Sequence, residues 1–478
     1  MAAMGLPRTR PLRDVVLILL GATAMHLASV FMGFYEPTGS IIVKTEVSSH
    51  FMEDFNNTIP APAVEDPVAK VETPRDRERE VQQILDAEKH TVDVSVELPE
   101  TTILSHAPGW TVFRNLYMSN GTLYVVTSEP HSFPAIRMMT STGLAAENTP
   151  ENIAAREPTA RDMDFLTPTE ARKRWGGDPT KSERNRVWTV GGNTVLVNEP
   201  AQFLDHYYHF CAELMMGAWP TWLGTFNVHV DPSAPSVEAA PHIDRFIFAH
   251  AEAQGWRDRP GFNAYFIRAS FPSLAIEVES DWKDRIAATA SSGAPERAWH
   301  FDTLMLTDRS AAFRGESCGS RNQRIASEAI EHFEKAGRLS RWWWEPLRQA
   351  VLRFAGIDQE VLEIGTKAGA VEARKKGAEV EWAGATSLSK PQPIVITYIS
   401  RQGARRHLID EDHQALVQAL TAMCAAHGWE LNIVQAERLT HDQQLALAAR
   451  TTVRIMLCSD QQQLTSWSRF YSGCTVMD

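Results

Sequence analysis

Two short clusters of polar residues have the types and spacing that chemistry requires. The first lies in residues 204–214, LDHYYHFCAEL, where His209 and Glu213 stand four residues apart. On a helix they would share one face. A carboxylate beside an imidazole orients the ring and fixes its proton, which suits a general base or a contact to a substrate hydroxyl. His206 and Asp205 directly precede the helix and could serve the same purpose. The alternative is an ordinary hydrogen bond at the edge of the core.

The second cluster is an arginine-rich loop after an apolar, β-branched run at residues 394–399. The loop carries Arg401, Arg405 and Arg406, and apolar residues at helical spacing predict a helix at residues 410–427. In open α/β sheets, ligands bind outside the carboxyl ends of the strands. Arginine guanidinium groups and the free N–H groups at a helix N-terminus can bind a phosphate there. The alternative is a solvated basic loop, partly neutralised by the acidic residues that open the helix.

The elements around the arginine loop alternate as a parallel sheet requires. Thr440 and Gln443 have the spacing of a capping box, which predicts a helix as far as Arg450. Strands are predicted at residues 394–399, 429–434 and 453–457. This pattern indicates a βαβαβ half of a doubly wound domain, with the arginines at its ligand-binding edge.

The elements around the histidine cluster predict a mixed α/β domain over residues 101–340. A hairpin is expected at Asn120–Gly121 and a second at Gly191–Gly192, after a polar insertion at residues 145–186. Further strands are expected at residues 245–249, 264–268 and 303–306, and helices at residues 207–223 and 323–336. Three consecutive tryptophans at residues 342–344 are expected to pack in the core rather than to form a sugar platform.

Composition excludes some classes of function. The 478 residues are 44% hydrophobic and 22% charged, which is ordinary for a globular protein. The net charge of −12 argues against a nucleic-acid partner, which requires a basic field. The five cysteines include no CxxC pair and no metal-ligand spacing, so no zinc site is expected and disulfides cannot be assigned.

The N-terminus predicts passage through a membrane. Three arginines precede residues 15–35, which contain no Lys, Arg, Asp or Glu and are long enough to span the hydrocarbon core. Because basic residues favour the cytoplasmic side, the rest of the chain is expected to be lumenal. The alternative is a cleaved signal peptide with an A-x-A site at residues 22–24, but the apolar run continues well past that site.

The predicted lumenal part begins with a stem. Residues 36–99 are polar, charged and proline-containing, with too few apolar residues to form a core. The sequons at Asn56 and Asn120 fit N-glycosylation in the secretory pathway.

Together the clusters resemble glycosyltransferase family 61, in particular its fungal-type members. That family includes the EGF-domain O-linked N-acetylglucosamine transferase and plant xylosyl- and arabinosyltransferases. The resemblance rests on the order and separation of four segments, FLDHYYHFCAELMMGAW (203–219), LMLTDRSAAFRG (304–315), ITYISRQGARRHL (396–408) and, more weakly, AERLTHDQQLALAARTTV (436–453). In the second segment, the DRS sequence at residues 308–310 is expected to be structural rather than a metal site.

The resemblance implies a GT-B-like α/β fold with two Rossmann-like domains facing a cleft, and inverting sugar transfer from a UDP-sugar without a metal or other cofactor. It implies that Arg401, Arg405 and Arg406 bind the donor diphosphate and that His209 and Glu213 act near the acceptor hydroxyl. The expected partners are a nucleotide sugar, a glycan or glycoprotein acceptor and a membrane of the Golgi or endoplasmic reticulum, which a single-pass type II anchor would enter. The expected organisation is a cytoplasmic tail (1–14), an anchor (15–35), a stem (36–100), an acceptor-side domain (101–340), a connector (341–390) and a donor-binding domain (391–478).

One segment departs from the family pattern. After the third predicted strand, family members carry a motif of the form HGxGLT, whereas this chain reads CSDQQQLT at residues 458–465. The histidine and the glycines are missing, so the C-terminal domain is expected to be incomplete. The second hypothesis is therefore a catalytically inactive lumenal protein that retains acceptor or partner recognition. A secreted hydrolase is a more distant alternative, since no G-x-S-x-G elbow is present.

Overall fold

The computed structural model describes residues 93–227, 240–290, 295–317, 325–340, 342–358, 361, 394–403 and 407–456. The predicted anchor at residues 15–35, the sequon at Asn56, the loop residues Arg405 and Arg406 and the segment 458–465 lie outside these residues. Among the helices in the described ranges, none is both long and apolar enough to cross a membrane.

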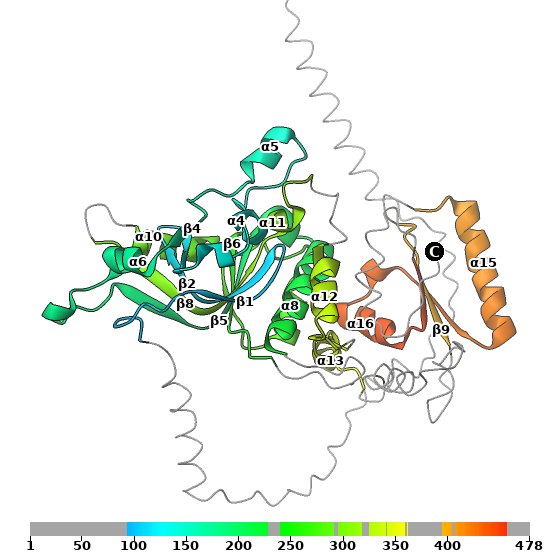
Figure 1. The fold of residues 1–478 in the computed structure, drawn as a ribbon. Helices are drawn as coiled ribbons and strands as arrows, with labels where there is room; N and C mark the ends of the chain where they lie inside the picture. Colours follow the sequence, from blue (N-terminus) through cyan, green and yellow to red (C-terminus); the bar gives the residue numbers. More distant parts are fainter. Residues whose placement is uncertain are drawn as a thin grey trace, which may run out of the picture. The chain divides into compact units, whose positions relative to one another are not determined.

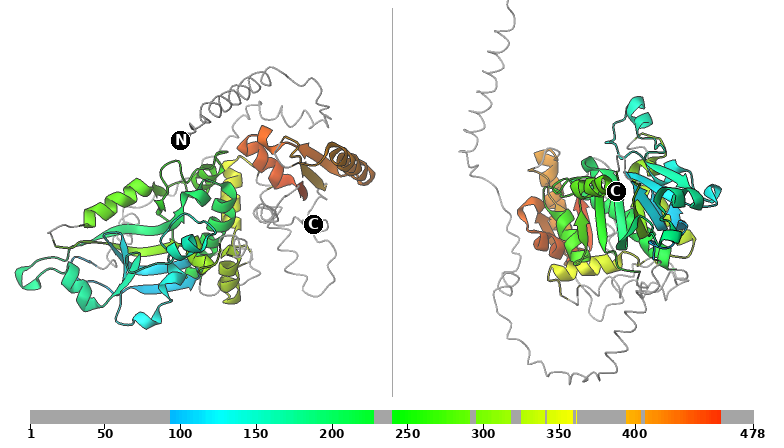
Figure 2. Two further views of the ribbon diagram at one scale, coloured as in Figure 1. Left: turned by 90° about the horizontal axis from the view of Figure 1, so that it is seen from above. Right: turned by 90° about the vertical axis from the view of Figure 1, so that its left-hand side faces the viewer.

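The first part of the fold is a mixed, eight-stranded sheet with the order β4-β3-β2-β8-β5-β6-β7, in which β1 pairs with β2. Within this sheet, β5 is parallel to β6 and to β8, and β6 is parallel to β7. Strand β2 is antiparallel to β1, β3 and β8. Figures 1 and 2 show the twisted sheet from three sides. The strands are β1 (Thr102–Ala107), β2 (Trp110–Ser119), β3 (Thr122–Val126), β4 (Met163–Leu166), β5 (Val187–Pro200), β6 (Arg245–His250), β7 (Ala275–Glu277) and β8 (Ala298–Thr307).

Helices cover both faces of this sheet because consecutive apolar residues of its central strands point to opposite sides. In β5, Val195 and Val197 pack with α8, α12 and α13, while Leu196 packs on the other side with Trp282 of α10. The helices of this part are α4 (Ile136–Met139), α5 (Pro150–Ala155), α6 (Pro168–Trp175), α7 (Ala201–Leu204), α8 (Met216–Phe226), α9 (Phe262–Ser270), α10 (Glu279–Thr289), α11 (Arg309–Phe313), α12 (Ile325–Lys335) and α13 (Glu345–Phe354), with the short turns η1 (Pro130–Ser132) and η2 (Pro179–Lys181) and the π-helix η3 (Tyr208–Met215).

Trp342, Trp343 and Trp344 are all buried, which confirms the expectation of core packing. The Trp344 ring stacks on Phe266 at 5.9 Å between ring centroids, and the Trp343 carbonyl accepts a hydrogen bond of 2.9 Å from Trp219 Nε1. Consecutive tryptophans thus contact different helices. They join the start of α13 to α8 and α9.

Two predictions for this part of the chain are wrong. Gly191 and Gly192 do not form a hairpin but lie inside the single strand β5, where the register against β8 shifts. Gly192 has φ +82°, and the next residue, Asn193, donates its N–H to Asp244 Oδ2 at 2.7 Å, so the glycines build a bulge. Residues 264–268, predicted as a strand, belong to α9. Their apolar run is too short to distinguish the two-residue period of a strand from the 3.6-residue period of a helix.

The second part is a three-stranded parallel sheet with the order β10-β9-β11, which confirms the predicted βαβαβ unit. Tyr398 of β9 contacts His413 on α15, while the adjacent Thr397 contacts Thr451 beyond α16, so the two helices cover opposite faces. The predicted capping box at Thr440 is present. The elements are β9 (Val395–Ile399), α15 (Asp410–His427), β10 (Glu430–Val434), the turn η4 (Ala436–Arg438), α16 (His441–Arg450) and β11 (Val453–Met456).

The predicted turn at Asn120 is confirmed: β2 and β3 form a hairpin, and Asn120 is exposed with φ +51°. Val94 and Leu98, which the sequence assigns to the stem, are buried in a cluster with Trp175. Packed structure therefore begins before β1.

Close packing of Gly217 in α8 against Trp110 gives a test of the core. A Cβ at this position would overlap the Trp110 indole, which is fully buried. Alanine normally favours a helix over glycine by about 1 kcal/mol, but overpacking costs about 1–3 kcal/mol. We expect Gly217→Ala to lower the free energy of unfolding by about 1–2 kcal/mol in urea titrations. Gly191→Ala is the matched control, because nothing lies within 4 Å of its Cβ position; equal stability of the two variants would contradict this packing.

Candidate active site

The site lies at the carboxyl ends of three parallel strands. Glu199 is the penultimate residue of β5, His250 ends β6, and Asp308 and Arg309 directly follow β8. Parallel strands place their carboxyl ends at one edge of the sheet, where α/β proteins bind ligands.

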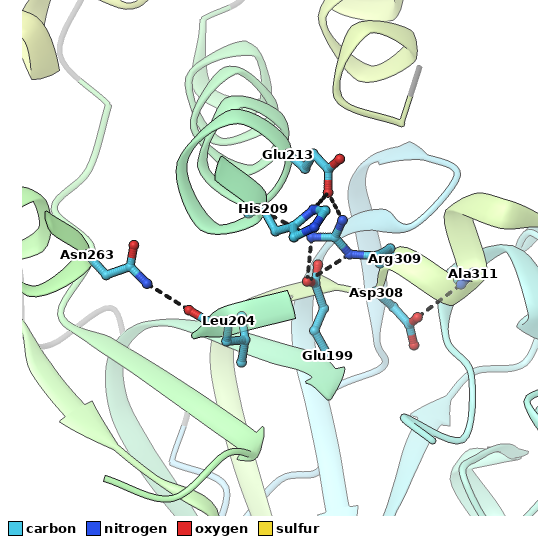
Figure 3. Close-up of polar contacts among 8 residues, drawn as sticks. All are labelled: Glu199, Leu204, His209, Glu213, Asn263, Asp308, Arg309 and Ala311. Carbon is cyan, nitrogen blue, oxygen red and sulfur yellow. Dashed lines mark hydrogen bonds and ion pairs between the residues drawn. The ribbon is translucent and has the colours of Figure 1, made fainter. Parts of the chain in front are cut away.

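His209 and Glu213 reach this edge from the π-helix η3. The helix before it is fixed by Asn263, which is fully buried and donates its side-chain amide to the carbonyls of Leu204 at 2.7 Å and Trp256 at 2.9 Å. Figure 3 shows the first of these bonds beside the cluster. The sequence predicts a regular helix from Tyr207, whereas the structure has a π-helix as far as Met215. Such turns are rare and frequently found at functional sites.

His209 and Glu213 belong to a four-residue cluster centred on Arg309 (Figure 3). His209 Nδ1 lies 2.7 Å from Glu213 Oε2, and Arg309 Nη1 forms an ion pair with the same oxygen. Arg309 also donates from Nε at 3.2 Å and from Nη2 at 3.0 Å to Glu199 Oε2. The side chains of Arg309 and Glu199 are 0% exposed and that of Glu213 is 2% exposed. Of the cluster, only His209 reaches solvent, at 24% exposed.

Two further contacts hold the Arg309 guanidinium. Its Cζ lies 4.3 Å from the centre of the Phe203 ring, a cation–π geometry. Its Nη2 also donates to the backbone carbonyl of His209 at 3.3 Å. Arg309 therefore connects β5 to both the side chains and the backbone of η3.

The environment of His209 keeps its ring neutral. Burial, and next the Arg309 guanidinium, lower the pKa of His209 from 6.5 to about 4, although the carboxylates of Glu199 and Asp205 oppose the shift. A carboxylate can only accept, so the hydrogen-bond network assigns the single ring proton to Nδ1, facing Glu213. Nε2 is left unprotonated, which is the state of a general base.

Asp308 fixes the backbone next to Arg309. Its carboxylate accepts from Ser141 N at 2.6 Å, Ser141 Oγ at 3.0 Å, Asn198 Nδ2 at 2.7 Å and Ala311 N at 2.9 Å. Burial raises the pKa of Asp308 to about 6 against the pull of these bonds. Asn198 Oδ1 in turn lies 2.7 Å from His250 Nε2. Asp308 thus has the expected structural role at the end of a strand, whereas Arg309 of the same DRS sequence belongs to the candidate site.

The structure brings some of the predicted site residues together. His209 and Glu213 are in contact as expected, and the His206 ring lies 5.2 Å from the His209 ring, with Nδ1 accepting from Tyr208 N at 3.2 Å. Asp205 is exposed. Arg401 is half-buried after β9 in the three-stranded sheet. Three acidic residues occupy the first turn of the following helix α15 and compete there with any phosphate.

Sequence reasoning missed Arg309 and Glu199. Both are charged residues placed directly at the end of an apolar strand, VLVNEP for Glu199 and TLMLTDR for Arg309. That position is a usable signal in a parallel sheet. Their pairing across the sheet depends on the neighbouring positions of β5 and β8.

Within the described ranges, no group of three or more His, Cys, Asp or Glu side chains could hold a metal ion. Comparison with known protein families and with curated proteins finds no match to this chain.

The buried ion pairs predict which arginine matters for stability. Arg309→Met would leave two buried carboxylates without their cation, so we expect a loss of about 3–5 kcal/mol in the free energy of unfolding. Arg137→Met is the matched control. Arg137 pairs with Glu157 at 2.9 Å, but the two side chains are 44% and 42% exposed, and such pairs contribute at most about 1 kcal/mol. Urea unfolding measures both, and a loss below about 1 kcal/mol for Arg309→Met would show that the cluster does not depend on it.

The pKa of His209 predicts a dependence of stability on pH. The unfolded chain takes up a proton near pH 6.5 and the folded chain only near pH 4. The free energy of unfolding should therefore decrease as the pH falls from 6.5 to 4. His209→Gln should make this decrease shallower without removing it, because burial also lowers the pKa values of four other histidines, His106, His206, His250 and His300. Asp308, whose pKa burial raises to about 6, acts in the opposite direction in both proteins. NMR titration of the ring should give about 4 for His209; a value near 6.5 would contradict the described environment.

Proposed function

We propose that the chain is an inverting, metal-independent glycosyltransferase of the GT-B type, similar to glycosyltransferase family 61. It would transfer a sugar from a UDP-sugar to a hydroxyl of a glycan or glycoprotein. The proposed location is the membrane of the Golgi or endoplasmic reticulum, with a single-pass type II anchor. The mixed α/β fold with parallel strands in both sheets is compatible with Rossmann-like domains.

The observation that carries the proposal is the neutral imidazole of His209, oriented by Glu213. An acceptor hydroxyl is a poor nucleophile until a base removes its proton. His209 has an unprotonated Nε2, a ring fixed at Nδ1 and partial exposure to solvent. These are the properties of a general base that an incoming hydroxyl can reach.

The Glu199 carboxylate favours proton uptake by His209 during the reaction, against burial and the Arg309 guanidinium, which keep the ring neutral at rest. At formal charge, one arginine and two carboxylates leave a net charge of −1 beside the neutral ring. Transfer of the acceptor proton to His209 would bring the whole cluster to neutrality. Fixed charges that match the charge developing in a transition state stabilise it without reorganisation.

The proposed reaction is a single displacement. The acceptor oxygen attacks the anomeric carbon while His209 Nε2 takes the hydroxyl proton. The bond between that carbon and the UDP oxygen breaks, and its electron pair leaves with UDP. Attack opposite the leaving group inverts the anomeric configuration.

Support for the donor side comes from the three-stranded sheet. Arg401 follows the carboxyl end of β9, the position at which open α/β sheets bind ligands. A guanidinium there can form paired hydrogen bonds to a diphosphate as its charge grows. The sequence adds Arg405 and Arg406 to the same loop.

The proposal predicts separable defects in donor binding and transfer. Arg401→Ala should abolish saturable binding of UDP in calorimetry. Arg450→Ala should not, because Arg450 lies at the opposite edge of the same sheet, paired with Glu430 at the start of β10. His209→Asn should retain UDP binding but lose transfer by about 10²–10⁴-fold, measured as release of UDP from a panel of UDP-sugars with added acceptors. The exposed His131 gives the control His131→Asn.

Two outcomes would contradict the proposal. Unchanged UDP affinity in Arg401→Ala would remove Arg401 from the donor site, and full transfer in His209→Asn would remove the base. Saturable UDP or acceptor binding without transfer for any donor would instead favour a catalytically inactive lumenal binding protein. The absence of the HGxGLT motif at residues 458–465 is the observation on which that second candidate rests.

A further inference from the structure

A small polar cleft is lined by Ser310 and Ala311 of α11, directly after Asp308 and Arg309. It is formed by α4, the segment after α5, and α11, and its polar lining includes Arg137, Arg156, Glu157 and Ser310. It is open to solvent, and the space it encloses is about 10 Å³, room for about one oxygen-sized group. Nothing in the proposed transfer reaction uses it.

The unusual residue of this cleft is Arg156, which is 5% exposed. Its Nε donates to Asn152 Oδ1 at 3.1 Å and its Nη1 to Ser310 Oγ at 3.4 Å, while Nη2 is buried with no hydrogen-bond partner. None of the ion pairs among the described residues joins Arg156 to a carboxylate. A guanidinium does not lose its proton in a protein, so this side chain is a buried cation without a counter-charge.

The other groups of the cleft are arranged to donate. Ser310 Oγ accepts from Arg156, which leaves its own proton free for a ligand. Arg137 neutralises Glu157, because its Nη2 donates to Glu157 Oε1 at 2.9 Å, and the remaining N–H groups of Arg137 are at the half-exposed rim. Gly315, with φ +75°, lets the backbone approach this pair, since a Cβ there would overlap both side chains. The cleft therefore has an excess of donors and of positive charge.

We propose that this cleft is a binding site for an oxyanion of the phosphate or sulfate class, with Arg156 as its main ligand and Ser310 and Arg137 as further donors. The enclosed part of the cleft is far too small for a whole small molecule, whose sites measure roughly 300–1,000 Å³. It therefore fits one anionic group, supplied either as free phosphate or as the phosphate or sulfate substituent of a sugar. The site is separate from the proposed donor and base sites, and the bound anion would fix the start of α11, which carries Arg309.

Thermal unfolding of the full chain in a titration with inorganic phosphate tests the proposal. The Tm should rise saturably with phosphate, since a ligand that binds only the folded state stabilises it. In Arg156→Met the rise should disappear, while the Tm without phosphate should stay the same or increase, because an unpaired buried charge has been removed. Arg172→Met, at an exposed position of α6, should behave like the wild type. Calorimetry with phosphate should agree, with binding lost in Arg156→Met alone.

Arg156→Lys and Ser310→Ala keep the test decisive if Arg156→Met does not fold. Lysine retains the charge without the planar fork, so phosphate affinity should fall about tenfold or more, and loss of the serine hydroxyl should weaken it as well. Unchanged affinity in both variants, an equal rise in Tm for the wild type and Arg156→Met, or no saturable response of the wild type at millimolar phosphate would overturn the proposal.

Competition experiments identify the source of the anion and separate this site from the donor site. Displacement of phosphate by glucose 6-phosphate or galactose 6-sulfate at lower concentration would assign the site to a substituted sugar, and displacement only by inorganic phosphate or sulfate would assign it to the free anion. UDP binding should survive Arg156→Met and disappear in Arg401→Ala. Loss of phosphate binding in Arg401→Ala rather than in Arg156→Met would show that the anion binds elsewhere, which would contradict its assignment to this cleft.

Discussion

The ion pairs of Arg309 with Glu199 and Glu213 are the interaction on which the candidate site depends. Burying three charges is unfavourable unless each finds a partner, and a guanidinium is the side chain that can serve two carboxylates at once. Glu199 comes from β5, Arg309 from the residue after β8, and Glu213 from η3. The requirement to pair these charges therefore fixes two neighbouring strands and a helix in one arrangement.

That arrangement leaves His209 as the one partly exposed member of the cluster. Glu213 shares a single oxygen between Arg309 and His209, so its charge is already partly compensated when it accepts the ring proton. His209 consequently keeps a defined tautomer while its pKa stays low. A carboxylate without the arginine would hold the same tautomer but would favour the imidazolium. Glu213 thus orients the His209 ring, while Arg309 opposes its protonation.

Much of the three-stranded sheet could be predicted from the sequence because its signals are local. Helix α15 has the predicted bounds, and the capping box at Thr440 is present. The bulge at Gly191–Gly192 looks like a hairpin turn in the sequence, because an extra residue breaks the alternation of β5 just as a hairpin does. The His209–Glu213 pair follows from helical spacing. The pairing of Arg309 with Glu199 does not, because it depends on the register of two strands more than a hundred residues apart.

The hydrogen bond from Arg309 to the His209 carbonyl has a consequence for dissecting the cluster. The same guanidinium supplies charge to two carboxylates and a donor to the main chain of the π-helix. Lysine could replace the charge, but its ammonium group cannot donate to three acceptors in the geometry of the planar guanidinium. Exchange at this position therefore alters electrostatics and main-chain geometry together. Glu199 contacts Arg309 only from the side of β5. A change at Glu199 would therefore alter the electrostatic field at the His209 ring while the π-helix η3 keeps its shape.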